Sequence, residues 1–347
     1  MQFIYILLAI LAFGFLIFIH ECGHYFVARR FGVTILEFSI GMGPKLISRV
    51  SKKNNIRYSL RLLPIGGFVS MAGEDSESED ANAFCNKPVY QRILITVAGA
   101  ATNIIVGIVA MIVIIGVSNT QLASNTIAEL PLNDDGINYS YESGLRVDDT
   151  ITKVNETTVH TGNEALYEIM HDGIHPIRLE VIRNGEKIVL ENVEFPTFTE
   201  QDTVFGDIDF KVYAEEKTFG NVMKHGWFRA GSTIKMIWES LFDLISGRYS
   251  IKSVSGPIGV TKELGKAAET GAFNFFYLVV VISMNLGVVN LLPFPALDGG
   301  RLIFLLIELI ARRPIPRKVE EYINLTGFIL LMILMVVIVV KDVIQLF

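Results

Sequence analysis

The sequence predicts a polytopic α-helical membrane protein with four transmembrane helices, a membrane-associated β-hairpin and an inserted small β-rich domain. Three observations support this fold class. Of the 347 residues, 51% are hydrophobic and 19% are charged, with a mean hydropathy of +0.44, which is more apolar than an ordinary soluble domain. Four apolar stretches approach the length that crosses a bilayer. One long polar insert between them carries strand and turn signals.

The apolar stretches are each about 20 residues long, as a membrane-spanning helix requires. They lie at about 3–26, 93–117, 273–292 and 323–340. The first stretch has no Lys or Arg before it and no small-residue cleavage pattern after it, so we expect a membrane helix and not a cleaved signal peptide. The predicted segments are a first helix at 1–30, a hairpin region at 31–92, a second helix at 93–117, the β-rich insert at 118–200, an amphipathic and linker region at 201–272, a broken third helix at 273–311, and a loop with the fourth helix at 312–347.

Basic residues flank the apolar stretches unevenly and predict the orientation. Arg29 and Arg30 follow the first stretch, Arg92 precedes the second, and four basic residues lie at 312–318 between the third and fourth. By the positive-inside rule these ends face the cytoplasm. Both termini and the segment 118–272 are therefore expected outside the cytoplasm. The net charge of −6 offers no general attraction for nucleic acid, and two cysteines cannot form a disulfide framework.

Two regions outside the apolar stretches show strand periodicity. Tyr58–Met71 alternates before Pro64 and resumes after Gly66-Gly67, which predicts a hairpin, and the acidic run after it at 74–80 predicts a solvated loop. In the insert, 177–181 and 187–190 alternate on either side of Asn184-Gly185, a two-residue hairpin turn, and 151–154 reads as another strand. The mixed apolar and charged segment 222–244 predicts an amphipathic helix on the outer membrane surface.

The most informative motif is His20-Glu-Cys-Gly-His24, near the cytoplasmic end of the first stretch. Ionisable residues are costly inside a membrane and usually mark function. On a helix, residues i and i+4 share a face, so both imidazoles can reach one metal ion while Glu21 points beside it toward a water. One zinc ion accounts for all three side chains together, whereas a polar helix end at the lipid headgroups would be the alternative.

Catalytic zinc keeps three protein ligands and one open position, so a third ligand is needed. The best candidate is Asp298, because Pro and Gly residues interrupt the apolar segment around it, and broken backbone is tolerated in a membrane only beside protein or a water-filled cavity. Glu308 on the same segment is a competing candidate. The other histidines fall in the insert beyond the membrane and are poorly placed: His160, His171, His175 and His225.

These motifs resemble those of the site-2 protease family of intramembrane zinc metalloproteases. His20-Glu-x-x-His24 and Asn290-Leu-Leu-Pro-Phe-Pro-Ala-Leu-Asp-Gly-Gly300 occur in the family's order, and the likeness covers essentially the whole chain. The closer resemblance is to the bacterial regulator of sigma-E protease type. It implies that His20, His24 and Asp298 bind Zn²⁺, that Glu21 is the catalytic base, and that Asn290 holds the substrate backbone or the oxyanion.

The resemblance also implies a substrate class, a location and a fold for the insert. The substrates would be single-span membrane proteins cut in or near their transmembrane segment, such as an anti-sigma factor or a remnant signal peptide. The protein would be a multi-pass protein of the bacterial inner membrane, with its active site toward the cytoplasm. The hairpin at 58–71 resembles a re-entrant hairpin that pairs with substrate. The segment 143–155 resembles part of a PDZ domain, with Asp148-Asp149 where relatives have Gly-Asp. The PDZ-like domain would bind a peptide or protein ligand.

Two further points stay open at the level of sequence. The segment Ala98–Asn103 lacks a proline that relatives carry after the glycine, and Asn103 could support the site or simply pack between helices. Two other functions compete with a protease. A non-catalytic PDZ membrane scaffold would leave the metal motif without a role, and an ion or proton transporter would use Glu21, Asp298 and Glu308 as a relay. The transporter is disfavoured because the chain shows no inverted repeat.

Overall fold

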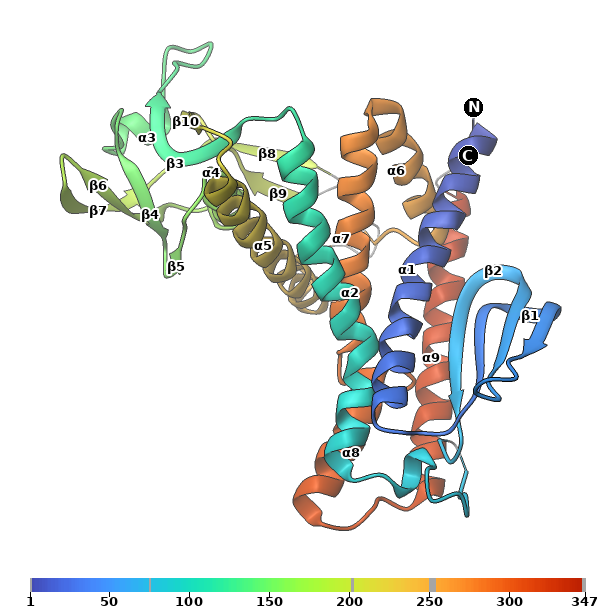
Figure 1. The fold of residues 1–347 in the computed structure, drawn as a ribbon. Coiled ribbons are helices and arrows are strands. Elements are labelled where there is room, and N and C mark those ends of the chain that lie inside the picture. Colours follow the sequence, from blue (N-terminus) through green and yellow to red (C-terminus); the bar gives the residue numbers. More distant parts are fainter. Residues whose placement is uncertain (1, 75, 201–202, 250–253, 345–347) are drawn as a thin grey trace. The chain divides into compact units, whose positions relative to one another are not determined.

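The computed structural model describes residues 2–74, 76–200, 203–249 and 254–344 (Figure 1). The chain separates into two compact units. Unit 1 comprises Met1–Gly107 and Ser255–Phe347, and unit 2 comprises Ile108–Val254. Unit 1 contains the motifs expected to carry the chemistry, and unit 2 contains the β-rich insert.

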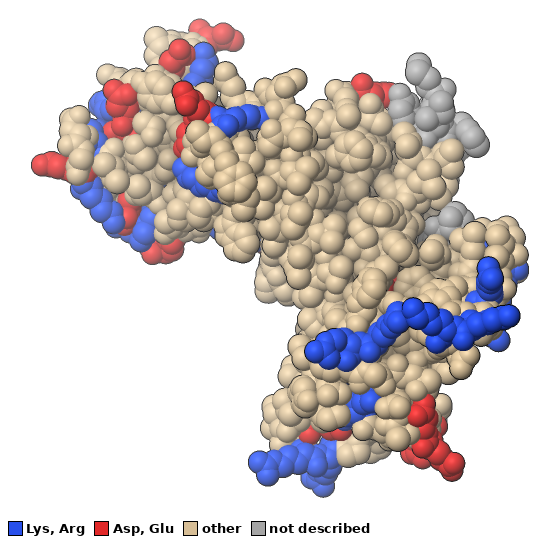
Figure 2. All heavy atoms as spheres, viewed as in Figure 1, with Lys and Arg blue, Asp and Glu red and all other residues tan. Residues whose placement is uncertain are grey.

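Four helices are long and apolar enough to cross a membrane: α1 (Gln2–Arg30), α2 (Val89–Val117), α7 (Ala272–Asn290) and α9 (Arg317–Ile344). Much of their apolar surface faces outward, and only 6% of the most apolar window of α9 is buried. On the face that Figure 2 shows, the helices of unit 1 carry a broad zone without charged side chains. Such a surface is compatible with lipid and not with water. Four apolar helices of membrane length, as predicted, are thus present among the described residues.

Small residues bring the helices of unit 1 close together. A Cβ added at Gly23 of α1 would lie 2.4 Å from the carbonyl oxygen of Ala98 in α2. On the other side of α2, Ser283 of α7 donates a hydrogen bond of 3.1 Å to the backbone oxygen of Asn103. Close backbone approach through small residues is how membrane helices gain packing energy without a hydrophobic drive between them. This packing holds the HExxH turn of α1 against α2.

The third apolar segment is broken, as its sequence predicts. Helix α7 ends at Asn290, and α8 (Asp298–Ala311) begins after seven residues of irregular chain. A Cβ at Gly299 would lie 2.1 Å from the carbonyl oxygen of Leu292, so only glycine lets the start of α8 fold back onto this loop. A further helix of unit 1, α6 (Pro257–Thr270), starts with proline at its first turn, where the missing N–H costs nothing. The short 3-10 helix η1 covers Phe84–Asn86.

The region between α1 and α2 contains two long antiparallel strands, β1 (Ile35–Val50) and β2 (Arg57–Met71). The chain reverses between the arms of β2 as predicted, near Gly66, whose φ is 85°. The two arms do not pair with each other, however, because Ile40 pairs with Leu60 on one side and with Gly67 on the other. The hairpin expected within 58–71 is therefore corrected: the first part of β1 lies between the arms, and sequence alternation could not show which strands become neighbours.

Unit 2 is built on an antiparallel sheet in the order β10-β3-β4-β6-β7, with β5 beside β4. Asn184 and Gly185 have φ values of 54° and 84°, which suits the predicted two-residue turn between β6 and β7. The predicted β-rich region is confirmed. The strand bounds are β3 Leu122–Glu129, β4 Thr150–Val154, β5 Thr157–Thr158, β6 Ile177–Arg183, β7 Glu186–Val193, β8 Thr197–Glu200, β9 Thr203–Gly206 and β10 Lys211–Glu215.

The described part of unit 2 also contains the helices α3 (Tyr139–Glu142), α4 (Gly162–Asp172) and α5 (Phe219–Ser246). Sequence reasoning missed α4, although Thr161 caps its first turn: the Thr161 hydroxyl accepts a hydrogen bond from the Glu164 amide, and the Glu164 carboxylate accepts one from the amide of His160. Helix α5 contains the amphipathic segment that was predicted. It buries one face within unit 2 and exposes bulky apolar side chains on another, among them Trp227, Phe242 and Ile245.

Candidate metal centre

His20 and His24 lie one turn apart on α1 and direct their Nε2 atoms to the same point. The two Nε2 atoms are 3.2 Å apart, and both rings are nearly buried, with side chains 10% and 12% exposed. The Nδ1 atom of His24 lies 2.8 Å from the carbonyl oxygen of Ile95 in α2. A carbonyl only accepts hydrogen bonds, so Nδ1 carries a proton, and in a neutral ring Nε2 is then the atom with the lone pair. The i, i+4 spacing therefore places both imidazoles on one face of α1, as predicted.

Asp298, the first residue of α8, is the third member of this group of potential metal ligands. Its Oδ2 atom lies 3.2 Å from Nε2 of His20 and 3.3 Å from Nε2 of His24. Asp298 reaches this position because the chain between α7 and α8 turns back sharply. Ala296 in that loop has a φ of 70°, and its amide donates to the Asn324 side chain of α9 at 3.3 Å. The strained turn is thus anchored on the fourth transmembrane helix.

The geometry of these three atoms fits a zinc ion. Ligands placed about 2.0 Å from a tetrahedral ion are about 3.3 Å from one another, and the three separations observed here are 3.2, 3.2 and 3.3 Å. Unprotonated Nε2 atoms and a carboxylate oxygen at these separations repel one another unless a cation lies between them. Within the described residues, His20, His24 and Asp298 are the one group of three or more potential ligands whose donor atoms lie within 4.8 Å of one another.

Gly99 of α2 forms one wall of the cluster. A Cβ at this position would lie 2.3 Å from Nε2 of His24 and 2.8 Å from Nε2 of His20. Any larger residue would push the imidazoles apart or occupy the position between them. Sequence reasoning considered this segment but singled out Asn103, not Gly99. The missed signal was a glycine in a transmembrane helix, which often marks close approach by another helix.

Glu21 lies beside the cluster and against β2. It interacts electrostatically with His20, His24 and Asp298. A Cβ added at Gly67 of β2 would lie 3.2 Å from Cγ of Glu21. Glycine at 67 therefore lets the strand pass directly over this carboxylate. The structure brings together four of the five predicted site residues, His20, Glu21, His24 and Asp298. Asn290 is the half-buried last residue of α7, at the other end of the loop that leads to Asp298.

The competing ligand candidates have other partners. Glu308 forms a two-point ion pair with Arg92, with N–O distances of 2.9 and 2.5 Å, and so is not a ligand of the cluster. His160 stacks on Phe228, His171 lies between Asp172 and Asp243, and His225 contacts Glu215. Asn103 is fully buried, and its side-chain amide has no hydrogen-bond partner among the described residues.

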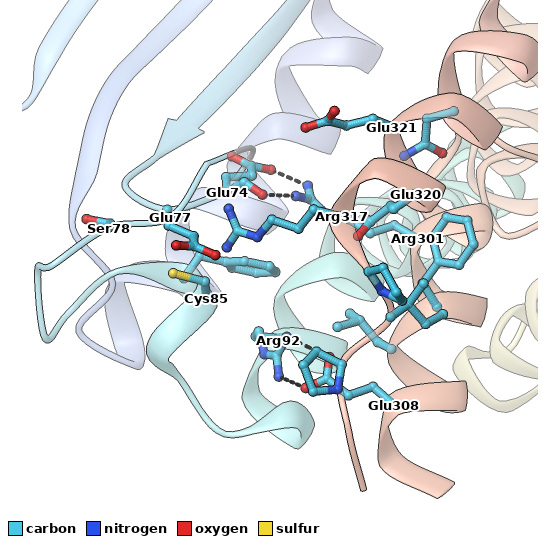
Figure 3. A pocket seen from close by; sticks show the side chains of 18 of the residues that line it. Glu74, Glu77, Ser78, Cys85, Arg92, Arg301, Glu308, Arg317, Glu320 and Glu321 are labelled. Carbon is cyan, nitrogen blue, oxygen red and sulfur yellow. Dashed lines mark hydrogen bonds and ion pairs between the residues drawn. The ribbon is translucent and has the colours of Figure 1, made fainter. Parts of the chain in front are cut away.

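A polar cavity of about 750 Å³ in unit 1 borders the cluster at Asp298, and Figure 3 shows the charged side chains of its wall. Asp298 is one of its lining residues, and acidic and basic side chains make up much of the remaining wall. Among the described residues of its wall, Arg92 pairs with Glu308 and Arg301 pairs with Glu74. Water can therefore reach the carboxylate of Asp298 even though the histidines lie within a bundle of apolar helices.

Comparison with known proteins identifies the family. Residues 8–334 match the model of peptidase family M50. The chain is 30% identical to the Regulator of sigma-W protease RasP of Bacillus subtilis, over 97% of this chain and 98% of that protein. It is 30% identical to the Zinc metalloprotease RasP of Geobacillus kaustophilus, over 96% of each. It is 36% identical to a Clostridium acetobutylicum protein named among the zinc metalloproteases, over 99% of this chain and 98% of that one. The chain therefore belongs to peptidase family M50 and is a multi-pass membrane zinc metalloprotease of the site-2 type, as its motifs predicted.

Proposed function

We propose that this protease cuts single-span membrane proteins in or beside their transmembrane segment, with His20, His24 and Asp298 holding the zinc ion and Glu21 as general base. One observation carries the assignment: three ligand atoms from two helices of unit 1 converge at 3.2 to 3.3 Å, the spacing that tetrahedral zinc requires. When bound, zinc supplies Lewis acidity, which polarises the scissile carbonyl and makes water nucleophilic near neutral pH.

Glu21 is suited to the proton transfers. It follows His20 directly on α1, so its carboxylate projects about 100° round the helix from that ligand and beside the ion. It would accept the proton of the attacking water and deliver it to the leaving amine nitrogen. Asn290, at the end of α7, would hydrogen-bond the substrate backbone or the developing oxyanion. Its support is the family motif and its position at the rim of the loop that leads to Asp298.

The substrate must be extended where it is cut, because a helix hides its carbonyls. The second arm of β2, Gly67–Met71, pairs on one side with 35–40, and no other strand pairing is found for it among the described residues. Apart from Met71, whose amide and carbonyl bond to Glu74, its free edge offers backbone donors and acceptors to an added strand, a mode of binding with few sequence demands. Gly67 places this edge next to Glu21. The arm would hold the opened substrate strand beside the metal ligands.

The orientation and the role of unit 2 are also part of the proposal. Arg29, Arg30 and Arg92 lie at one end of α1 and α2, and basic residues near the start of α9 extend the pattern, which supports a cytoplasmic position for these ends. The active site would then face the cytoplasm, with the termini and unit 2 outside. Unit 2 would be a PDZ-like domain that binds an extended peptide or protein segment. The exposed Trp and Phe residues of α5 suit contact with the outer membrane surface.

The substrate class is supported by one relative. The Bacillus subtilis protein is named for regulation of sigma-W, which makes an anti-sigma factor one candidate, and a remnant signal peptide is another. A non-catalytic scaffold or a transporter would give Glu21 no role in hydrolysis.

The test is a cleavage assay with the full chain in proteoliposomes and a labelled single-span substrate. We expect wild type to carry about one zinc and to cleave, and Glu21→Gln to retain zinc while cleavage falls at least about 1,000-fold, the upper range for general acid–base catalysis. Cleavage by Glu21→Gln at the wild-type rate would refute the assigned role.

A further inference from the structure

Arg301 connects the helix of the third ligand to the strand that lies over Glu21. It is three residues after Asp298, about one turn along α8, and lines the same cavity. Its Nη2 atom donates to the backbone oxygen of Glu74 at 2.8 Å, and its Nη1 atom donates to the carboxylate of the same residue at 2.5 Å (Figure 3). The guanidinium also lies 5.0 Å from the ring centroid of Phe84. Such multipoint contacts hold a guanidinium in one orientation.

Glu74 is itself hydrogen-bonded to the last residue of β2. Its second carboxylate oxygen accepts a hydrogen bond of 3.1 Å from the amide of Met71, the last residue of the strand, and its own amide donates to the carbonyl of Met71 at 3.3 Å. A continuous chain of hydrogen bonds therefore runs from α8 through Glu74 to Met71. The pair is largely shielded, with side chains 25% and 17% exposed, so it is stronger than a surface ion pair.

The arm Gly67–Met71 is consequently held at both ends. At Gly67 it lies against Glu21 on α1, and at Met71 it is tied to α8, the helix that begins with Asp298. The two attachment points belong to the two helices that supply the metal ligands. The pair of Arg301 with Glu74 therefore helps to hold the end of this strand in place relative to the helix that begins with Asp298.

We propose that Arg301 is a positioning residue that determines which peptide bond of a bound substrate strand faces the metal cluster. This inference rests on the proposed function, in which the substrate pairs with the free edge of Gly67–Met71. A strand repeats every two residues, about 7 Å, and a slip of that length keeps the same side chains on the same face. Loss of the tie should therefore let the substrate be cut at bonds displaced mainly by two residues.

Arg92 provides a matched control. Its pair with Glu308 lines the same cavity, also has two N–O contacts, and is similarly shielded, with side chains 13% and 16% exposed. It joins the start of α2 to α8 and makes no contact with β2 among the interactions found for the described residues. We expect its removal to loosen α8 and to leave the strand attached.

The experiment uses full-length protein in proteoliposomes with a single-span substrate, and measures zinc content, kcat, KM and the cut positions by mass spectrometry. We expect Arg301→Met to keep about one zinc, to lose roughly tenfold in kcat/KM, chiefly in kcat, and to spread cleavage over neighbouring bonds, with Arg301→Lys restoring part of the wild-type distribution. Arg92→Met should keep the single wild-type cut. Glu74→Ala tests the same tie from its other partner, so the inference remains testable if Arg301→Met does not fold.

Two results would overturn the inference while the protease assignment stands: wild-type cut positions in both Arg301→Met and Glu74→Ala, or an equal spread in Arg92→Met. A wild-type chain that cleaves no membrane substrate would instead refute the proposed function, and the inference with it.

Discussion

Asp149 in unit 2 and Asp298 in unit 1 are both shielded aspartates, but the chain neutralises them differently. Asp149 is fully buried, and its two oxygens accept hydrogen bonds of 2.7 and 2.8 Å from Arg183 and one of 2.8 Å from the amide of Arg146. Within the described residues, Asp298 contacts Nε2 of His20 and Nε2 of His24, the atoms through which neutral imidazoles bind a metal. A buried carboxylate needs a cation. Where the chain supplies the cation the site is structural, and where it supplies only further ligands the site calls for a metal.

The largest expected effect comes from removing Asp298. Asp298→Ala should lower zinc affinity by more than about 100-fold, beyond the range for groups that only support a ligand, and should abolish cleavage. Metal analysis after competition with a graded series of chelators would measure this. Asp149→Ala is the control and should keep its zinc. Full zinc retention by Asp298→Ala would show that Asp298, like Asp149, is not a metal ligand.

Gly99→Ala should weaken zinc binding without disturbing the fold. The added methyl group would lie 2.3 Å from Nε2 of His24, so the imidazoles must move apart. We expect zinc affinity to fall about 10- to 100-fold, as for other disturbances of ligand orientation, while helicity by circular dichroism stays at the wild-type value. Gly231→Ala on α5 is a matched control, because a Cβ there meets nothing within 4 Å. Unchanged zinc affinity in Gly99→Ala would contradict the close packing of α2 on the ligands.

Asp149→Ala should test the structural half of the comparison. It leaves the guanidinium of Arg183 without its partner, which costs about 3 kcal/mol for a largely buried pair. Hydrogen exchange of the peptides covering β4 and β6 in the full-length protein should rise accordingly, with zinc content unchanged. The double variant Asp149→Leu with Arg183→Met should recover much of the protection, because an apolar pair leaves no charge unpaired. Lower protection in the double variant than in Asp149→Ala would show that the pair does more than neutralise charge.

The smallest expected effect is the pH dependence of stability that His171 contributes through its ionised partners. A hydrogen bond with Asp172 raises the pKa of His171 above its ordinary 6.5, with help from Asp243 and Glu239 and against burial and Arg248. The stabilisation is complete below pH 6.5 and is lost as pH rises through the higher folded pKa. Hydrogen exchange in α4, corrected for its intrinsic pH dependence, should therefore increase on going from pH 6.5 to 8.5. His171→Gln should flatten this dependence, and an equal increase in that variant would assign it to another group.

Much of the site could be predicted because it is encoded locally. The spacing of His20 and His24 puts both on one helical face whatever surrounds it, and four stretches of membrane length follow from composition alone. Asp298 could be predicted because a carboxylate in a broken apolar segment needs a cation. The turn at Asn184-Gly185 could be predicted because both residues tolerate positive φ.

The remaining features depend on which distant segments meet. The alternation of apolar and polar residues predicted strands at 58–71, but it did not show that 35–40 lies between the two arms of β2. The pattern within one strand does not specify which other strand pairs with it. Gly99 looked like any glycine of an apolar helix until its backbone met the imidazoles, and Arg301 and Glu74 are 227 residues apart. The sequence by itself determined the donor atoms and the membrane helices, since both follow from local spacing and hydropathy. Tertiary structure alone decided how closely those donors converge and which strand lies over Glu21, because both depend on packing between segments far apart in the chain.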